Sequence, residues 1–417
     1  MADTIRTCIV LLENTWPKRG GTSELLYNFA FGLAELGFEV HFASFINRYQ
    51  KEPLPIFRQH FYHDYARGEC PSKSTLGITA LRRLGQAANV NANVLRVNFD
   101  ISFRRFLRSV LRTHGVEVVL IGTCWPAPAT VAAASSMGIP TVQYLNAVES
   151  DSLHGLSLPN RLLAHWTEGV GISASFKTTV VSEEDKKILL RRGFAEEGLV
   201  LIPNCVDYRK YELVTGDQVL EVRRRLGARD RPIIVFVGGL DYPPNRLAVR
   251  RIYETIAPAV LREIPDAIFL VIGPNPPEEY VHPSIIYTGG LYDQELAAHI
   301  LAADIGIAPI ELGTGTRLKV LEYFAAGKPV VSTTIGALGL EAKHGKNIMI
   351  ADQYSKFSEH VTSILNSPPL GKELGEEAKV VAKEKYSREV LAEKLALVLE
   401  EAVSHSRRIA SRSGTHA

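Results

Sequence analysis

A chain of 417 residues is too long for one compact core, so two domains of about 200 residues each are expected. Apolar residues make up 46% of it and charged residues 22%, as in an ordinary globular protein. No apolar run reaches the ~18 residues of a membrane span, and the polar start MADTIRT leads straight into a strand, so no secretory signal is expected. The four cysteines are isolated, which argues against a disulfide framework and favours a reducing cytoplasm.

Apolar strands and helices alternate through the first half of the chain. The expected strands are 7–12, 40–44, 116–121, 141–144, 178–181 and 199–202, and the expected helices are 23–36, 101–113, 127–136 and 182–192. This spacing predicts a parallel sheet covered by helices on both faces, with ligands at the carboxyl ends of its strands. The proline-containing segment 46–98 has no regular period and receives no assignment.

A glycine pair, Gly20 and Gly21, lies in the turn between the first strand and the first helix. Backbone amides in such a turn can point at an anionic ligand, although a plain tight turn explains the pair equally well. Further along, His60, His63 and Asp64 are residue types that bind metals. The sequence offers neither a fourth ligand nor a helix to align them, so we predict no metal site.

The same alternation resumes at Ile233. The expected strands are 233–237, 267–272, 285–287, 305–308, 329–332 and 347–350, and the expected helices are 245–260, 293–302 and a helical region over 373–403. We therefore predict an α/β chain with domains at 1–205 and 206–385, followed by a C-terminal helix and tail at 386–417. The tail, SHSRRIASRSGTHA, has no apolar period and is expected to be disordered.

The stretch between Ile305 and Ser332 carries the strongest functional signal. A short strand leads into a loop with Gly313 and Gly315, and a helix is expected to begin near Thr314 or Thr316. Arg317 and Lys319 then fall in the first turn, where the helix dipole disfavours cations unless an anion is bound. Free amides, glycines and two cations together predict a phosphate or diphosphate site. The alternative is an ordinary turn followed by a surface pair between Lys319 and Glu322.

The run GTGTRLKVLEYFAAGKPVVST resembles the nucleotide-sugar loop of retaining glycosyltransferases with the GT-B fold, in particular glycosyltransferase family four. Gly20-Gly21, IPNCVD at 202–207 and VFVGGLDYPPN at 235–245 fit the same family. The resemblance implies two Rossmann-like doubly wound domains facing across a cleft, with the first on the acceptor side, the second on the donor side and the last helix crossing back to the first. It implies sugar transfer from a nucleoside diphosphate sugar, with retained anomeric configuration and with no metal or other cofactor.

The resemblance also assigns residues. Glu322 would accept hydrogen bonds from the donor ribose, while Arg317, Lys319 and Asn146 would act in catalysis. The implied donor-binding residues are Gly20, Gly21, Gly238, Gly239, Asn245, Thr288, Gly313, Thr314, Gly315, Thr316 and Glu322.

Three positions depart from the family pattern. Gly239 and Pro244 stand where many relatives carry an Arg and a Lys, and we interpret Arg317 and Lys319 as compensation. The first Glu of the family's pair is absent, which leaves Thr314 or Glu311 as substitutes. Asn146 replaces the usual first-domain His.

These departures leave a second hypothesis open, a catalytically silent protein that binds a nucleotide sugar or a glycan. A sugar-nucleotide epimerase or phosphorylase lacks an identifiable catalytic pair or cofactor lysine. A nicotinamide oxidoreductase would need GxGxxG after a strand, which VGGLDYPPN does not supply.

The formal net charge of +2 is unevenly distributed, because residues 48–112 carry an excess of eight positive charges. Four of them, Arg104, Arg105, Arg108 and Arg112, share a helix whose apolar stripe faces elsewhere. The hypothesis is that this face docks on an anionic membrane or a lipid-diphosphate acceptor; the alternative is a solvated basic face. The expected location is the cytoplasm or the inner membrane surface, with a glycan or lipid-linked acceptor and no nucleic acid partner.

Overall fold

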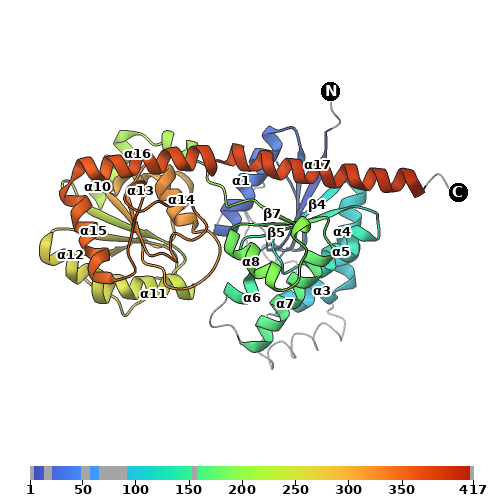
Figure 1. The fold of residues 1–417 in the computed structure, drawn as a ribbon, viewed down its shortest axis with the longest axis horizontal. Coiled ribbons are helices and arrows are strands. Elements are labelled where there is room, and N and C mark those ends of the chain that lie inside the picture. The colour runs from blue at the N-terminus through green and yellow to red at the C-terminus, as the bar shows by residue number, and fades with distance from the viewer. Residues whose placement is uncertain (1–3, 14–20, 48–56, 65–91, 153–156, 414–417) are drawn as a thin grey trace. The chain divides into compact units, whose positions relative to one another are not determined.

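The computed structural model describes residues 4–13, 21–47, 57–64, 92–152 and 157–413. The chain forms two compact units, Met1–Pro203 with Leu391–Ala417, and Asn204–Val390. Each contains one parallel sheet with helices packed on it (Figure 1). The predicted α/β class is confirmed, with two Rossmann-like sheets.

The first unit contains a seven-stranded sheet in the order β3-β2-β1-β4-β5-β6-β7, and its neighbouring strands pair in parallel. The strands are β1 Arg6–Glu13, β2 Glu39–Asn47, β3 Arg58–Asp64, β4 Val118–Ile121, β5 Thr141–Leu145, β6 Lys177–Val180 and β7 Leu199–Leu201. The helices are α1 Gly21–Glu35, α3 Ala92–Phe99, α4 Ile101–Thr113, α5 Ala127–Ser135, α6 Glu149–Ser152, α7 Leu158–Ala174, α8 Glu183–Arg191 and the 3-10 turn η2 Glu196–Gly198.

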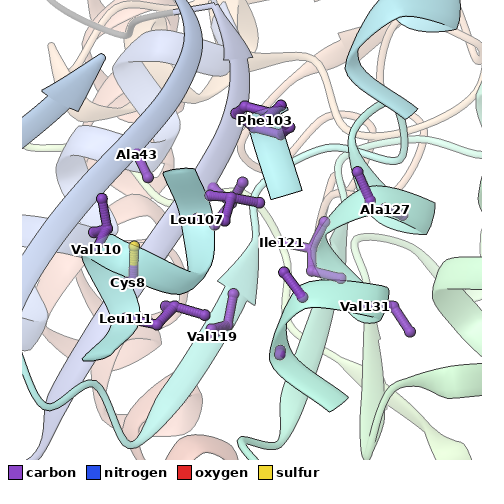
Figure 2. Close-up of a cluster of buried hydrophobic side chains, with 14 of the residues drawn as sticks. Cys8, Ala43, Phe103, Leu107, Val110, Leu111, Val119, Ile121, Ala127 and Val131 are labelled. Carbon is purple, nitrogen blue, oxygen red and sulfur yellow. The ribbon is translucent and has the colours of Figure 1, made fainter. Parts of the chain in front are cut away.

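The core of this unit forms because β1 is apolar on both faces. Successive strand residues point to opposite sides, so Val10 packs toward α4 while Leu11 lies near Leu26 of α1. Figure 2 shows the α4 side, where Phe103 and Leu107 fill the space above β1 and β4. Burying each such side chain contributes about 1.5–3 kcal/mol. The helix therefore keeps one face on the sheet and turns its arginines away from it.

The second unit contains a six-stranded parallel sheet in the order β10-β9-β8-β11-β12-β13. The strands are β8 Ile233–Val237, β9 Ile268–Ile272, β10 Ile285–Tyr287, β11 Ile305–Ala308, β12 Val330–Ser332 and β13 Met349–Ile350. The helices are α9 Arg209–Glu212, α10 Gly216–Arg225, α11 Pro243–Arg251, the π-helical η3 Ile252–Ile256, α12 Ala257–Glu263, α13 Asp293–Ala302, α14 Leu318–Ala325, α15 Tyr354–Asn366 and α16 Pro368–Lys385. The strand order reverses between β8 and β11, and ligands of doubly wound sheets bind at such a switch point.

The described part of the tail that was expected to be disordered, residues 404–413, is helical, because α17 extends over Arg388–Ser413. Two contacts hold its last turns within the first unit: Ser406 Oγ donates to the carbonyl of Gly138 at 3.0 Å, and Arg407 pairs with Glu117 at 2.6 Å. These tertiary contacts thus stabilise the end of the helix, although its sequence has no apolar repeat at helical spacing. No described helix is both long and apolar enough to cross a membrane.

Part of the unassigned segment 46–98 is now placed. β3 extends the first sheet beyond β2, and α3 precedes α4. Residues 48–56 and 65–91 lie outside the described residues, as do Gly20 and the side chains of His63 and Asp64.

Candidate functional site

Two loops of the second unit meet where β8 and β11 end side by side, with Gly306 paired to Val235. Helix α14 is fixed against both strands by Tyr323. Its ring lies so close to Gly306 that a Cβ there would come within 2.4 Å of it, and its hydroxyl accepts the Val237 amide at 2.9 Å. A glycine at 306 is therefore required for α14 to approach the sheet, and this approach sets where the loop between β11 and α14 lies.

The loop before α14 is held by Arg317. Its guanidinium donates to the carbonyls of Leu312 at 3.0 Å, Gly313 at 2.6 Å and Thr314 at 2.9 Å. Gly313 and Gly315 have φ values of 99° and 76°, which suit glycine. Through these contacts Arg317 stabilises the conformation of the loop, in addition to any contact that it makes with a ligand.

The expected start of α14 was wrong. The helix begins at Leu318, and Arg317 is its extended N-cap with φ −89° and ψ 101°. The two positive-φ glycines delay the start because they shape the preceding residues into a loop. Lys319 remains in the first turn, whereas Arg317 lies outside the helix.

Lys319 reaches back to the turn that follows β8. Its Nζ donates to Asn245 Oδ1 at 2.6 Å and lies 4.0 Å from the centre of the Phe236 ring, while Asn245 Nδ2 donates to the Gly239 carbonyl at 2.9 Å. Burial, with a smaller contribution from Arg317, holds the pKa of Lys319 well below its usual range. An anion bound here would reverse that effect, because a nearby negative charge favours the protonated amine. The predicted neighbours Gly238, Gly239, Asn245 and Lys319 thus come together.

Two threonines in the same loop have incomplete hydrogen bonding. Thr314 Oγ1 and Thr316 Oγ1 are buried and have no partner among the described atoms. Buried hydroxyls in folded proteins are nearly always hydrogen-bonded. A ligand with several acceptor oxygens would satisfy both.

Glu322 is 6% exposed and lies further along α14. Its Oε2 accepts from Lys210 Nζ at 2.7 Å and from the Tyr211 hydroxyl, both on α9. We did not single out Lys210 and Tyr211 from the sequence, although they follow the IPNCVD motif directly. Glu322 is therefore a positioned carboxylate and not half of a surface pair with Lys319.

The other donor-side residues are more dispersed. Glu311, a candidate for the missing first Glu, pairs with Arg251 at 2.8 Å and accepts from the Tyr354 hydroxyl. Thr288 follows the edge strand β10 and donates its Oγ1 to the Gly289 carbonyl. No described contact of Thr288 reaches the loop before α14.

In the first unit, Asn146 follows β5 and its Nδ2 donates to Thr22 Oγ1 at 3.0 Å. Thr22 is the second residue of α1, so Asn146 and the helix start at Gly21 lie at one place. A nearby carboxyl that the sequence analysis missed is Glu149, whose pKa burial and the charges of Glu168 and Asp185 raise to about 7. The acidic run VESD was the available signal.

The four-arginine face of α4 is only partly as expected. Arg104 donates to the Asn98 carbonyl at 2.6 Å, and the side chains of Arg105 and Arg112 are exposed. In the same unit, Phe99 at the end of α3 stacks on Trp166 of α7 with ring centres 5.8 Å apart. Further exposed apolar side chains of this region are Ile101, Leu158 and Leu162.

Models of two known families match the two halves of the chain. Residues 19–210 match the model of Glycosyltransferase Family 4, and residues 231–367 match that of Glycosyl transferases group 1. The chain is 31% identical over 138 residues to an uncharacterized 44.6 kDa protein in the cps region of Klebsiella pneumoniae, covering 31% of this chain and 36% of that protein. It is 29% identical over 164 residues to the putative teichuronic acid biosynthesis glycosyltransferase TuaH of Bacillus subtilis, covering 37% and 38%.

The aligned part thus spans little more than a third of these two relatives. Among solved structures, HepE from Anabaena, in complex with UDP and glucose, superposes with a TM-score of 0.68 at 15% identity, over 94% of this chain and 99% of that one. The two doubly wound units therefore have the GT-B fold.

Proposed function

We propose that this GT-B chain is a glycosyltransferase that moves a sugar from a nucleoside diphosphate sugar to a glycan or lipid-linked acceptor, with retention of configuration. The observation that carries the proposal is the loop before α14 with the first turn of that helix, which hold the partly buried Lys319 amine and two buried threonine hydroxyls that have no partner among the described atoms. A diphosphate supplies both the negative charge and the acceptor oxygens that these groups lack.

In this proposal Lys319 neutralises the leaving diphosphate. Transfer breaks the bond between the anomeric carbon and the β-phosphate oxygen, and the electron pair leaves with the diphosphate. The acceptor hydroxyl oxygen bonds to the same face of the sugar and gives its proton to the departing phosphate oxygen. Charge on the diphosphate grows as the bond breaks, so a fixed cation stabilises the transition state more than the ground state. Arg317 keeps the loop in shape, and no divalent ion or other cofactor is required.

Glu322 is proposed to orient the donor ribose. Its Oε2 is engaged by Lys210 and Tyr211, which fixes the carboxylate so that Oε1 can accept from a ribose hydroxyl. Thr314 is the better substitute for the missing first Glu, because Glu311 is engaged by Arg251 and Tyr354.

On the acceptor side we propose that the exposed surface around Phe99 and Trp166, with Arg105 and Arg112, docks the first unit on an anionic bilayer. Leu158, Leu162 and Trp166 are spaced four residues apart and so share one face of α7. Apolar insertion beside basic side chains is the combination that binds such a surface. A lipid-linked acceptor in the same bilayer would then lie close to the first unit.

The first experiment is a thermal-shift screen with UDP-, GDP-, ADP- and TDP-sugars, followed by measurement of free nucleoside diphosphate release without acceptor. UDP-sugars come first, because HepE was solved with UDP and glucose. Stabilisation with slow release supports an enzyme, and NMR of the product made with an acceptor reports its anomeric configuration. Stabilisation without any release or transfer would instead support the silent nucleotide-sugar binder.

A further inference from the structure

Three histidines from separate elements of the first unit converge. His41 lies on β2, His60 on β3 and His114 follows the last turn of α4. One ring nitrogen from each lies within 4.8 Å of the other two. None of the three belongs to the proposed sugar-transfer site, and only His60 was considered from the sequence as a metal ligand.

The cluster sits at the amino edge of the first sheet. His41 is the third residue of β2 and His60 is the third residue of β3, while His114 precedes β4. His60 pairs in register with Ala43, two residues beyond His41, so the two rings share one face of the sheet. Asn146, by contrast, follows the carboxyl end of β5. Within the first unit, the histidines are therefore at the opposite edge of the sheet from Asn146.

The geometry between His41 and His60 fits a shared ion. His41 Nδ1 lies 3.3 Å from His60 Nε2, and two imidazole nitrogens bound at ~2.0–2.1 Å to a tetrahedral metal are about 3.3 Å apart. His41 is buried and His60 and His114 are partly buried, so the rings already lie out of bulk water.

Glu39 supplies the partner that metal-binding histidines usually have. Its Oε1 lies 3.2 Å from His41 Nε2, on the far side of the ring from His60. A carboxylate in this place accepts a hydrogen bond from the Nε2–H group of His41. This fixes the tautomer in which the lone pair of Nδ1 faces His60.

We propose that His41 Nδ1, His60 Nε2 and one ring nitrogen of His114 bind a divalent transition metal, with Zn²⁺ the best fit, and that Glu39 orients His41 from outside the coordination sphere. Water would complete the tetrahedron. Nitrogen ligands in this number suit Zn²⁺, Co²⁺ or Ni²⁺ and not Mg²⁺ or Ca²⁺, which prefer oxygen. The ion would cross-link β2, β3 and the end of α4, so its role would be structural.

The test uses the full chain, purified without a polyhistidine tag and stripped with a chelator. Calorimetry with ZnCl₂ should give one tight site, and CoCl₂ should give the visible absorption of tetrahedral Co²⁺. The variants His60→Gln and His114→Gln should each weaken Zn²⁺ binding at least about 100-fold, and Glu39→Gln about 10–100-fold. The matched control His165→Gln removes an exposed histidine of α7 and should bind as the parent does.

Circular dichroism and melting of the metal-free variants separate lost binding from lost folding. Zn²⁺ should raise the melting temperature of the parent and of His165→Gln, but not that of folded His60→Gln. Absence of a stoichiometric site in the parent, or equal Zn²⁺ affinity in His60→Gln and His165→Gln, would overturn the proposal and leave a stacked cluster of neutral rings. MgCl₂ in place of ZnCl₂ should give no heat of binding at this site.

Discussion

Each sheet has an ionisable group with a shifted pKa near its carboxyl edge: the amine of Lys319 in the second unit and the carboxyl of Glu149 in the first. Burial shifts both away from their charged forms, lowering the pKa of Lys319 and raising that of Glu149. An anion would restore the charge of Lys319 but would further oppose ionisation of Glu149. The comparison favours the second unit for a diphosphate and the first for a neutral hydroxyl group such as that of a sugar acceptor.

The largest effect is expected from Lys319→Ala. Loss of one group that stabilises developing charge typically lowers kcat about 10²–10³-fold, and we expect kcat to fall by more than the donor KM rises. Steady-state kinetics with varied donor measure both quantities. The control Lys356→Ala removes an exposed lysine paired with Glu359 at 2.8 Å and should leave both unchanged. Unaltered kinetics in Lys319→Ala, with activity dependent on added Mg²⁺, would contradict the metal-free mechanism.

Glu322→Gln is expected to weaken donor binding about 10–100-fold, since loss of a hydrogen bond to a charged group costs about 1.5–3 kcal/mol. The same change leaves the buried ammonium of Lys210 without its carboxylate, so melting should be recorded for each variant and the donor Kd measured well below the melting temperature. Tyr211→Phe is the matched control because it removes a donor to Oε2 only. A donor Kd that is equal in the parent and in Glu322→Gln would refute the ribose assignment.

The sequence predicted most strands because long apolar runs between glycines and prolines have few alternatives. It also singled out the loop before α14, which we propose binds the donor, because Gly313, Gly315 and the two cations form a local pattern. The contacts of Glu322 could not be predicted in the same way, since Tyr211 is 111 residues away in sequence.

Elements without a clear local period were the ones missed. β3 is stabilised by pairing with β2. The end of α17 is stabilised by its contacts with Gly138 and Glu117. The histidine cluster was overlooked for the same reason, because His41, His60 and His114 come from three distant segments. From the sequence alone His60 was grouped with His63 and Asp64, which are close to it along the chain.

Glu149→Gln should change stability with pH. The pKa of Glu149 is about 7 in the folded state, against an ordinary value of 4.5. Between pH 4.5 and pH 7, therefore, the folded chain keeps Glu149 protonated while the unfolded chain has lost that proton. The stability that Glu149 contributes is full below about pH 4.5 and is lost as the pH rises through 7. Glutamine stays neutral, so the variant should be more stable than the parent at pH 8 by about 3 kcal/mol, and the two should converge at pH 4.

Urea unfolding at both pH values measures this difference. The acidic groups facing Glu149 are Glu168 of α7 and Asp185 of α8, and they are unchanged in the variant. The control Glu197→Gln alters an exposed carboxylate and should show no such pH dependence. Equal stability of Glu149→Gln and the parent at pH 8 would show that Glu149 is ionised there at no cost.

The smallest effect concerns the exposed arginines of α4. Each basic residue near an anionic bilayer contributes about 1 kcal/mol, so Arg105→Gln and Arg112→Gln should each weaken binding to anionic vesicles about fivefold. Arg104→Gln is the informative comparison, because its guanidinium donates to the Asn98 carbonyl and is less available to lipid. Co-sedimentation with vesicles containing phosphatidylserine measures binding, and vesicles of phosphatidylcholine alone control for apolar insertion at Trp166. If both kinds of vesicle bind the parent equally, the arginines form only a solvated face and the first unit recognises its acceptor without help from lipid charge.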